Sequence, residues 1–169
     1  MYSGNTLGYQ GVFEFLVQTQ NASFALPLVI VGKADEALRK NVSHLEREGK
    51  VFFLGEKTIE ETNILIKKSF FCILPRLTVC SSMKVLHYFS NDKPVFAKNI
   101  PYNNECIVHE KNGILYDSPS ELLAFYEKAV TNRSFYKSLS VGAAITGKNI
   151  RDNWLQNDFI QAYGNTIQK

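Results

Sequence analysis

Residues 81–94 read Ser81-Ser-Met-Lys-Val-Leu-His-Tyr-Phe-Ser-Asn-Asp-Lys-Pro94, a pattern typical of a short helix that leads into a strand. Ser81 or Ser82 can cap this helix, because a hydroxyl oxygen accepts from the first free N–H groups. Lys84 falls in the first turn, where the helix dipole disfavours a positive charge. His87 follows three residues later, near the same face. The pattern predicts a helix whose N-terminus faces a negatively charged group.

Short apolar runs lie on both sides of this helix and recur along the chain. Continuous apolar runs of four to six residues are typical of strands that are buried on both faces of a sheet. The expected strands are the fragment Tyr2-Ser3 and the runs Leu26 to Gly32, Val51 to Leu54, Phe70 to Leu74, Pro94 to Ala97 and Gly113 to Tyr116.

Helical patterns separate these runs. Two capping boxes mark helix starts, Thr58-Ile-Glu-Glu61 and Ser118-Pro-Ser-Glu121. The other expected helices cover Ala34 to Glu48, Glu105 to His109, Ser134 to Thr146 and Trp154 to Ile167. Strands that alternate with helices predict an α/β fold, here a Rossmann-like parallel sheet of about six strands with helices on both faces.

The bulk properties are those of a single globular domain and exclude several other classes. The chain has 169 residues, of which 45% are hydrophobic and 21% charged. A net charge of +3 is too small to indicate nucleic-acid binding, and no apolar run is long enough to cross a membrane. Cys72, Cys80 and Cys106 lack the spacing of a metal site and are odd in number. We therefore expect no bound metal, free thiols and a cytoplasmic protein.

Ligands of such sheets bind beyond the carboxyl ends of the strands, where the strand order reverses. The first of the loops at that edge is Gly4-Asn-Thr-Leu-Gly-Tyr-Gln-Gly11, which opens a helix near Gly8 or Gln10. Small residues allow the backbone to approach an anion, and free N–H groups at a helix start can receive a phosphate. The loop matches neither G-x-G-x-x-G nor a P-loop. A tight turn that requires positive φ angles explains its glycines equally well.

Two interpretations of Lys84 and His87 remain open at this level. In the first, both side chains and the helix N-terminus hold a phosphorylated, hydroxyl-rich ligand such as a nucleotide. In the second, Lys84 lies in solvent and His87 packs beneath a neighbouring loop. Glu56 and Glu105 are the carboxylates expected on the site side of the sheet. No pair of carboxylates and no Ser/His/Asp set is present, so catalytic residues stay unassigned.

The order of several motifs resembles the C-terminal, donor-binding domain of bacterial GT-B glycosyltransferases of group 1, a retaining nucleotide-sugar family. The matching segments are Val29-Ile-Val-Gly32, Val51-Phe-Phe-Leu-Gly55, Phe71-Cys-Ile-Leu-Pro75, Ser81-x-Met-Lys84-x-x-His87-Tyr88, Lys93-Pro94-Val95, Glu105 with Asn112-Gly113-Ile-Leu, and Trp154. Each motif alone is loose, but their order and spacing together are specific, and the resemblance covers nearly the whole chain.

The resemblance implies a nucleotide-sugar site on this domain. It places Gly4, Asn5 and Gln10 near the donor phosphates and Gly55 and Glu56 near the base. It places Ser81, Ser82 and Lys84 near phosphate and sugar, and His87 near the ribose.

The chain departs from the family pattern at two places. Many relatives carry Glu-x7-Glu where Val79 and His87 stand here, and Arg and Lys where Asn5 and Gln10 stand. Lys84, backbone amides and the helix start are then left as the expected phosphate ligands.

The resemblance also implies a function for a longer enzyme. It predicts transfer of a hexose or N-acetylhexosamine from a nucleotide-sugar, with a UDP-sugar favoured and no cofactor, to a glycan or lipid-linked acceptor. Capsule or O-antigen polysaccharide synthesis at the inner face of the bacterial membrane is the expected setting. Residues 1–169 would form the donor-binding domain, and the N-terminal acceptor domain would be absent, so the isolated domain is expected to be inactive.

Two other function classes fit an α/β domain of this size. A receiver-like or sugar-phosphate-binding module would need clustered acidic residues at the end of the first strand, where Gly4-Asn5-Thr6 has none. A nicotinamide or flavin domain would need the glycine fingerprint and its following acidic residue.

Overall fold

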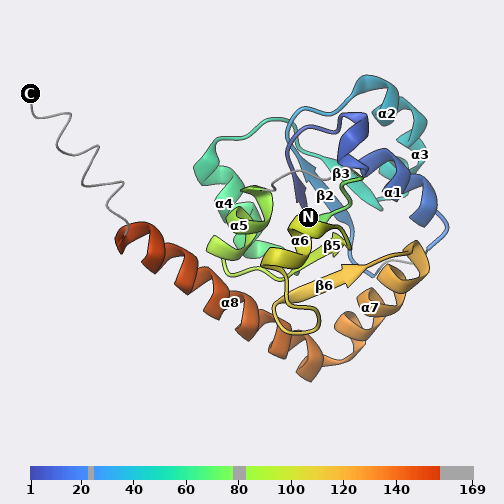
Figure 1. Cartoon of the computed structure of the whole chain (residues 1–169). Coiled ribbons are helices and arrows are strands. Elements are labelled where there is room, and N and C mark those ends of the chain that lie inside the picture. The colour runs from blue at the N-terminus through green and yellow to red at the C-terminus, as the bar shows by residue number, and fades with distance from the viewer. Residues whose placement is uncertain (23–24, 78–82, 157–169) are drawn as a thin grey trace, which may run out of the picture.

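The computed structural model describes residues 1–22, 25–77 and 83–156 (Figure 1). Strands and helices alternate along nearly all of this length. In chain order the elements are β1 (Tyr2–Ser3), the 3-10 helix η1 (Gly8–Gln10), α1 (Val12–Thr19), β2 (Leu28–Val31), α2 (Glu36–Asn41), α3 (Ser43–Arg47), β3 (Val51–Phe53), α4 (Ile59–Lys68), β4 (Cys72–Leu74), α5 (Met83–Ser90), β5 (Val95–Lys98), α6 (Pro101–Cys106), β6 (Gly113–Tyr116), α7 (Pro119–Thr131) and α8 (Arg133–Gln156).

The six strands are all parallel and form two three-stranded ladders, β1-β2-β3 and β4-β5-β6. Two main-chain hydrogen bonds join the ladders, from the Met1 amino group to the Phe71 carbonyl and from Ile73 N–H to the Met1 carbonyl, each 2.8 Å. Read across both ladders, the strand order is 3-2-1-4-5-6, that of the doubly wound Rossmann fold. The predicted six-stranded parallel sheet is therefore confirmed. It is divided into two ladders because β1 is only two residues long.

Two hydrophobic clusters cover the two faces of the sheet. Alternate strand residues point to opposite faces, so Ile73 and Phe96 belong to one cluster while Leu74 and Ala97 belong to the other. The first cluster includes residues of α1, α2, α3 and α7, the second includes residues of α4 and α5, and α8 contributes to both. Figure 1 shows α1 and α7 on one side of the strands and α4 and α5 on the other. The helices on both faces that the sequence predicts are thus present.

Capping side chains set two helix starts as the sequence predicts. At α4, Thr58 Oγ1 accepts from Glu61 N–H at 3.2 Å and the Glu61 carboxylate accepts from Thr58 N–H at 2.9 Å, which completes the capping box. At α7, Ser118 Oγ accepts from Glu121 N–H at 3.2 Å. The Glu121 carboxylate accepts from Asp117 N–H instead of Ser118 N–H, so this second box is only half formed.

The single helix predicted over Ala34 to Glu48 is wrong. Two helices, α2 and α3, cover this region and are separated at Val42, whose φ is −105° and ψ 15°. Val42 is β-branched and stands between an Asn and a Ser, all three of which are weak helix formers. The side chain of Val42 remains in the core, together with Leu38 and Leu45, so the apolar face predicted from the sequence is present although the helix is interrupted.

The short helix predicted over Glu105 to His109 is also misplaced. The observed helix α6 spans Pro101–Cys106 and has proline in its first turn, a position that suits the fixed φ of proline. It ends at Ile107, which is extended with ψ 118° and is buried. The helix thus begins four residues before the predicted segment and shares only Glu105 and Cys106 with it.

The C-terminal region forms one helix where two were predicted. α8 runs without a break from Arg133 to Gln156. The first predicted helix was to end at Thr146, but α8 continues through Gly147. A Cβ atom on Gly147 would lie 2.0 Å from the Phe89 carbonyl oxygen of α5. This glycine therefore permits close packing of two helices and does not end one. The predicted helix Trp154 to Ile167 lies mainly outside the described residues. Within them, no helix is both long and apolar enough to cross a membrane.

The turn after β1 is pressed against neighbouring backbone. A Cβ atom on Gly11, whose φ is +68°, would lie 2.0 Å from the Pro75 carbonyl oxygen. A Cβ atom on Gly32, whose φ is +123°, would lie 2.4 Å from the Gly4 carbonyl oxygen. Both positions need glycine for the left-handed backbone and for the close approach. The sequence offered a tight turn with positive φ angles as a steric explanation of its glycines. Such a turn is present.

Gly11 and Gly49 provide a matched test of this steric constraint. Their φ angles are +68° and +69°, but a Cβ atom on Gly49 would have nothing within 4 Å. Gly49→Ala should cost about 1–2 kcal/mol of stability from the left-handed backbone alone. Gly11→Ala should cost at least about 2 kcal/mol more, because the turn must also move away from Pro75. Urea unfolding of both variants measures the difference, and equal losses would contradict the close contact.

Candidate functional site

The candidate site lies at the carboxyl ends of β1 and β4, the two strands between which the strand order reverses. Three segments meet there: the turn from Gly4 to Gly11, the residues that directly follow β4, and the first turn of α5. A ligand site is expected at this point of a doubly wound sheet. The contact between Gly11 and the Pro75 carbonyl holds the first two segments together, and Lys84 ties the third to the first.

Lys84 reaches from α5 into the turn after β1. Its Nζ donates to the Tyr2 hydroxyl at 2.7 Å and to Gln10 Oε1 at 2.9 Å. It also lies 4.5 Å from the centre of the Tyr2 ring, within the range of a cation–π contact. The Tyr2 hydroxyl donates in turn to the Asn5 carbonyl at 2.6 Å. The second interpretation of Lys84, a side chain in solvent, is therefore wrong.

The electrostatic environment of Lys84 is unusual for a lysine. Burial, and to a smaller degree the positive charge of Arg76, lowers the pKa of Lys84 to about 8. Burial likewise raises the pKa of the Tyr2 hydroxyl, so that it stays neutral. The hydrogen-bond partners of the ammonium group are two neutral oxygens, and no carboxylate among the described residues pairs with it. The positive charge of Lys84 is thus not balanced by a carboxylate of the described residues.

Arg76 is a second cation at this edge and was missed by the sequence analysis. It follows Pro75 directly, is half-buried, and its guanidinium carbon lies 5.4 Å from the centre of the Tyr9 ring. Its buried Nε has no hydrogen-bond partner among the described residues. An arginine immediately after a strand at the switch point was a signal in the sequence.

The predicted residues of the first turn are brought together. Gln10 is buried, with 4% of its surface exposed, and its side chain contacts Lys84. Gly4 lies against the same lysine, because a Cβ atom there would be 2.5 Å from Lys84 Nζ. Asn5 takes part through its carbonyl oxygen, whereas its side-chain oxygen accepts from Leu7 N–H within the turn at 3.4 Å. These three residues and Lys84 thus form one contiguous group.

Gly55 and Glu56 lie at the same edge of the sheet, after β3. Gly55 has φ +69°, and its carbonyl accepts from Gly32 N–H at 2.8 Å, which ties the two neighbouring loops together. The side chain of Glu56 is exposed. Neither residue contacts the Lys84 group in the described structure, so these two predicted positions belong to a separate part of the edge.

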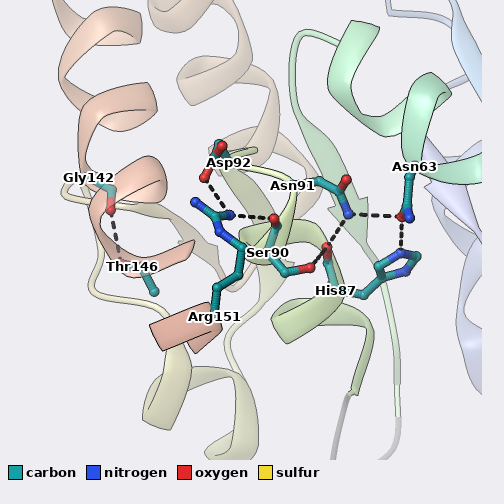
Figure 2. A network of polar contacts seen from close by, with 8 residues as sticks. All are labelled: Asn63, His87, Ser90, Asn91, Asp92, Gly142, Thr146 and Arg151. Atoms are coloured by element: carbon teal, nitrogen blue, oxygen red, sulfur yellow. Dashed lines mark hydrogen bonds and ion pairs between the residues drawn. The ribbon is translucent and has the colours of Figure 1, made fainter. Parts of the chain in front are cut away.

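His87 lies on α5 and takes part in a second network, drawn in Figure 2. Its Nε2 is 2.6 Å from Asn63 Oδ1 on α4, and Asn91 Nδ2 is 3.0 Å from the same oxygen. Asn91 Nδ2 also donates to the His87 carbonyl at 3.0 Å. Partial burial lowers the pKa of His87, which favours the neutral imidazole. Neither asparagine was identified from the sequence, because their roles depend on the packing of α4 against α5.

The predicted site residues Ser81 and Ser82 lie outside the described residues, as does Val79. The helix predicted for this stretch is confirmed from Met83 to Ser90, but its cap belongs to the part that is not described. Among the described residues, no three His, Cys, Asp or Glu side chains gather as metal ligands. The described part of the site therefore offers two cations, Lys84 and Arg76, beside the neutral polar groups of Tyr2 and Gln10.

A parallel sheet of order 3-2-1-4-5-6 with helices on both faces defines a doubly wound, Rossmann-like α/β domain. Residues 8–132 match the family model described as "Glycosyl transferases group 1". The chain belongs to this family of GT-B glycosyltransferases. The two alternative classes, a receiver-like module and a nicotinamide or flavin domain, are thereby excluded.

Three similar proteins illustrate the relationship. The chain is 28% identical over 137 residues to glycosyltransferase 1 domain-containing protein 1 of Xenopus tropicalis, covering 79% of this chain and 39% of that protein. It is 27% identical over 121 residues to the O-antigen chain mannosyltransferase RfbU of Salmonella typhimurium, covering 70% and 33%. Its fold matches that of HepE from Anabaena, solved in complex with UDP, with a TM-score of 0.72, 16% identity and coverage of 92% and 47%. The chain thus spans less than half the length of each.

Direct titration of Lys84 tests the electrostatic description of the site. The Lys84 ammonium group should titrate with a pKa of about 8, because it is buried and repelled by Arg76. Arg76→Leu should raise this pKa, since it removes the like charge. Side-chain NMR of lysine-labelled protein, with the resonance assigned by its loss in Lys84→Arg, measures both values. A Lys84 pKa near 10.4, the value of a free lysine, would show that the side chain is exposed in solution.

Proposed function

We propose that this chain is the C-terminal, nucleotide-sugar-binding half of a GT-B glycosyltransferase. The observation that carries the proposal is the partly buried Lys84 ammonium group, which is held by Tyr2 and Gln10 with no carboxylate partner among the described residues at the switch point of the sheet. The family membership supports the transferase chemistry. The fold shared with HepE, a protein solved with UDP, supports a uridine nucleotide as the ligand.

In this proposal the diphosphate lies over the turn from Gly4 to Gly11. Lys84 supplies the main charge-assisted hydrogen bond, and Gln10 supplies an amide donor beside it. Arg76 adds a second positive charge from the other side of the switch point. As the bond from the sugar to the diphosphate breaks, negative charge accumulates on the departing phosphate. Fixed cations at that position stabilise this charge more than that of the intact substrate, so they favour transfer and not binding alone.

The rest of the nucleotide-sugar is assigned to the neighbouring loops. Gly55 and Glu56 would lie beside the base and His87 beside the ribose. Ser81 and Ser82 would lie near phosphate and sugar. The proposal needs no cofactor or metal beyond the nucleotide-sugar itself, and it assigns no catalytic residue to this chain.

The whole enzyme would carry a second domain that binds the acceptor, because the chain spans 39% and 33% of the two relatives. We propose that it transfers a hexose or N-acetylhexosamine to a glycan or lipid-linked acceptor, in the cytoplasm or at the inner face of the membrane. The similarity to an O-antigen mannosyltransferase supports a role in bacterial surface polysaccharide synthesis, such as capsule or O-antigen. Residues 1–169 alone should bind the nucleotide but not transfer the sugar.

Nucleotide binding to the chain tests the proposal directly. UDP should raise the melting temperature, and ADP and NAD should raise it less at equal concentration. Lys84→Ala should weaken UDP binding about tenfold or more, because a charge-assisted hydrogen bond to phosphate is worth roughly 1.5–3 kcal/mol. Titration calorimetry at low salt measures the dissociation constants.

Lys67→Ala is the matched control for this substitution. Lys67 is exposed in the last turn of α4, and its removal changes the net charge by the same amount. It should leave the UDP dissociation constant within about twofold, since exposed charges at a distance are screened by salt. Equal effects of the two substitutions would remove Lys84 from the site. No binding of any nucleoside diphosphate would overturn the proposed function.

The direction in which UDP affinity changes with pH follows from the charge state of Lys84. The free protein loses the Lys84 charge as pH rises through about 8, and a bound phosphate stabilises that charge and raises the pKa. UDP should therefore bind about tenfold more weakly at pH 9 than at pH 7, with proton uptake near pH 8. Lys84→Arg should largely remove the dependence, because a guanidinium stays charged throughout. Binding heats in two buffers of different ionisation enthalpy report the proton uptake, and identical heats would contradict it.

A further inference from the structure

The amide of Asn91 has a single allowed orientation. Asn91 is buried, with 5% of its surface exposed, and one of its side-chain atoms lies 3.0 Å from the His87 carbonyl oxygen. A carbonyl oxygen can only accept a hydrogen bond, so the Asn91 atom that faces it must be Nδ2. The second hydrogen of that nitrogen is then directed to the side chain of Asn63, 3.0 Å away. Figure 2 shows these contacts in sequence.

This orientation fixes the next two groups. The Asn63 atom that meets Asn91 Nδ2 must be an acceptor, which makes it Oδ1. His87 Nε2 lies 2.6 Å from the same oxygen. Two acceptors cannot share a hydrogen bond, so Nε2 must carry a proton. The His87 carbonyl can only accept a hydrogen bond. Through Asn91 and Asn63, this fixes the proton of the neutral His87 ring on Nε2.

We infer that Asn63, oriented by Asn91, is a positioning residue that holds neutral His87 in the tautomer protonated on Nε2 and leaves Nδ1 as a hydrogen-bond acceptor for a ligand hydroxyl. The role of the hydroxyl rests on the proposed function, and a ribose hydroxyl of the nucleotide is the group meant. The tautomer itself rests only on the contacts around Asn63.

The geometry of the imidazole ring supports the second half of the inference. The lone pairs of the two ring nitrogens diverge, so a ring with Nε2 turned to Asn63 turns Nδ1 away from it. No described residue donates to Nδ1. His87 is half-buried on α5, one turn beyond Lys84. A neutral imidazole with Nε2–H offers one acceptor, suited to one hydroxyl donor.

Nitrogen NMR tests the tautomer in the free chain. Two-bond proton–nitrogen correlation of histidine-labelled protein distinguishes a protonated ring nitrogen from an unprotonated one. At a pH above its pKa, His87 should show Nε2 as the protonated nitrogen, with assignment by the loss of its signals in His87→Gln. His109 is an internal reference, because its Nδ1 accepts from Leu115 N–H at 3.1 Å and its neutral form must also carry the proton on Nε2. A protonated Nδ1 or averaged signals for His87 would overturn the inference.

Two substitutions of Asn63 separate positioning from packing. Asn63→Leu keeps the approximate size and removes the acceptor, so the His87 signals should move towards the averaged values of a mixed tautomer. Asn63→Asp keeps the acceptor, so Nε2–H should persist and the pKa of His87 should rise beside the carboxylate. Melting temperatures confirm that both variants fold. An unchanged tautomer in Asn63→Leu would show that Asn63 does not set it.

Titration with UDP tests the ligand half separately. In the wild type the His87 Nδ1 signal should shift on binding, and Asn63→Leu should weaken binding about threefold to tenfold while Asn63→Asp weakens it less at a pH where His87 is neutral. Binding of UDP without a change at Nδ1 would overturn the role of the hydroxyl. Failure of UDP to bind would overturn the proposed function and that role together, while the free-protein spectrum would still decide the tautomer.

Discussion

The junction between β1 and β4 is the constraint on which the rest of the structure depends. Two main-chain hydrogen bonds, from Met1 to Phe71 and from Ile73 to Met1, bring the two three-stranded ladders into one layer. Strand order reverses at this junction, so the loops that follow β1 and β4 leave the sheet side by side and then diverge to opposite faces. The close approach of Gly11 to the Pro75 carbonyl is a consequence. A second is the reach of Lys84 to Tyr2 across 82 residues of sequence. Without the junction, none of the proposed phosphate ligands would be neighbours.

The cations of the site and those of the protein surface have different kinds of partner. Surface cations such as Arg39 and Lys128 have carboxylate partners, Glu46 and Glu110, and each pair is locally neutral. Lys84 instead binds two neutral oxygens and is partly buried, so the loss of water is only partly compensated and its pKa falls. The anionic ligand of the proposed function would restore that compensation. A lysine paired with a carboxylate would be more stable in the free protein and would bind a phosphate less well. The same reasoning explains why the unfavourable lysine in the first turn of α5, seen in the sequence, is tolerated.

The sequence predicts the strands and most helix starts but little of the side-chain network. Strands buried on both faces are continuous apolar runs, and capping boxes such as Thr58 with Glu61 depend on neighbours within one turn; both are local patterns. The continuity of α8 through Gly147 depends on packing against the distant backbone of Phe89, which local propensity does not show, whereas the break at Val42 follows a run of weak helix formers that the apolar periodicity of the segment concealed. Of the site, Lys84 and Gln10 were identified by type and place. Tyr2 and Asn63 were not, because a buried tyrosine and an asparagine on a helix have no distinctive local pattern. Arg76 was also missed, although its place after a strand at the switch point was a signal.

In the polar networks of Lys84 and of His87, the donor and acceptor of each hydrogen bond are fixed, and for the same reason. Each contains a group that can play only one role. In the first, the Lys84 ammonium group can only donate, so the Gln10 atom that meets it must be Oε1, and the amide nitrogen of Gln10 is left to donate elsewhere. In the second, the His87 carbonyl can only accept, so Asn91, Asn63 and His87 Nε2 are ordered in turn. In the proposed function, the free ends of the two networks would meet different parts of one ligand. An amide donor beside a cation suits a phosphate, and an imidazole acceptor suits a hydroxyl. The neutral amides of Gln10, Asn63 and Asn91 thus orient the polar groups of the two networks without adding a charge to them.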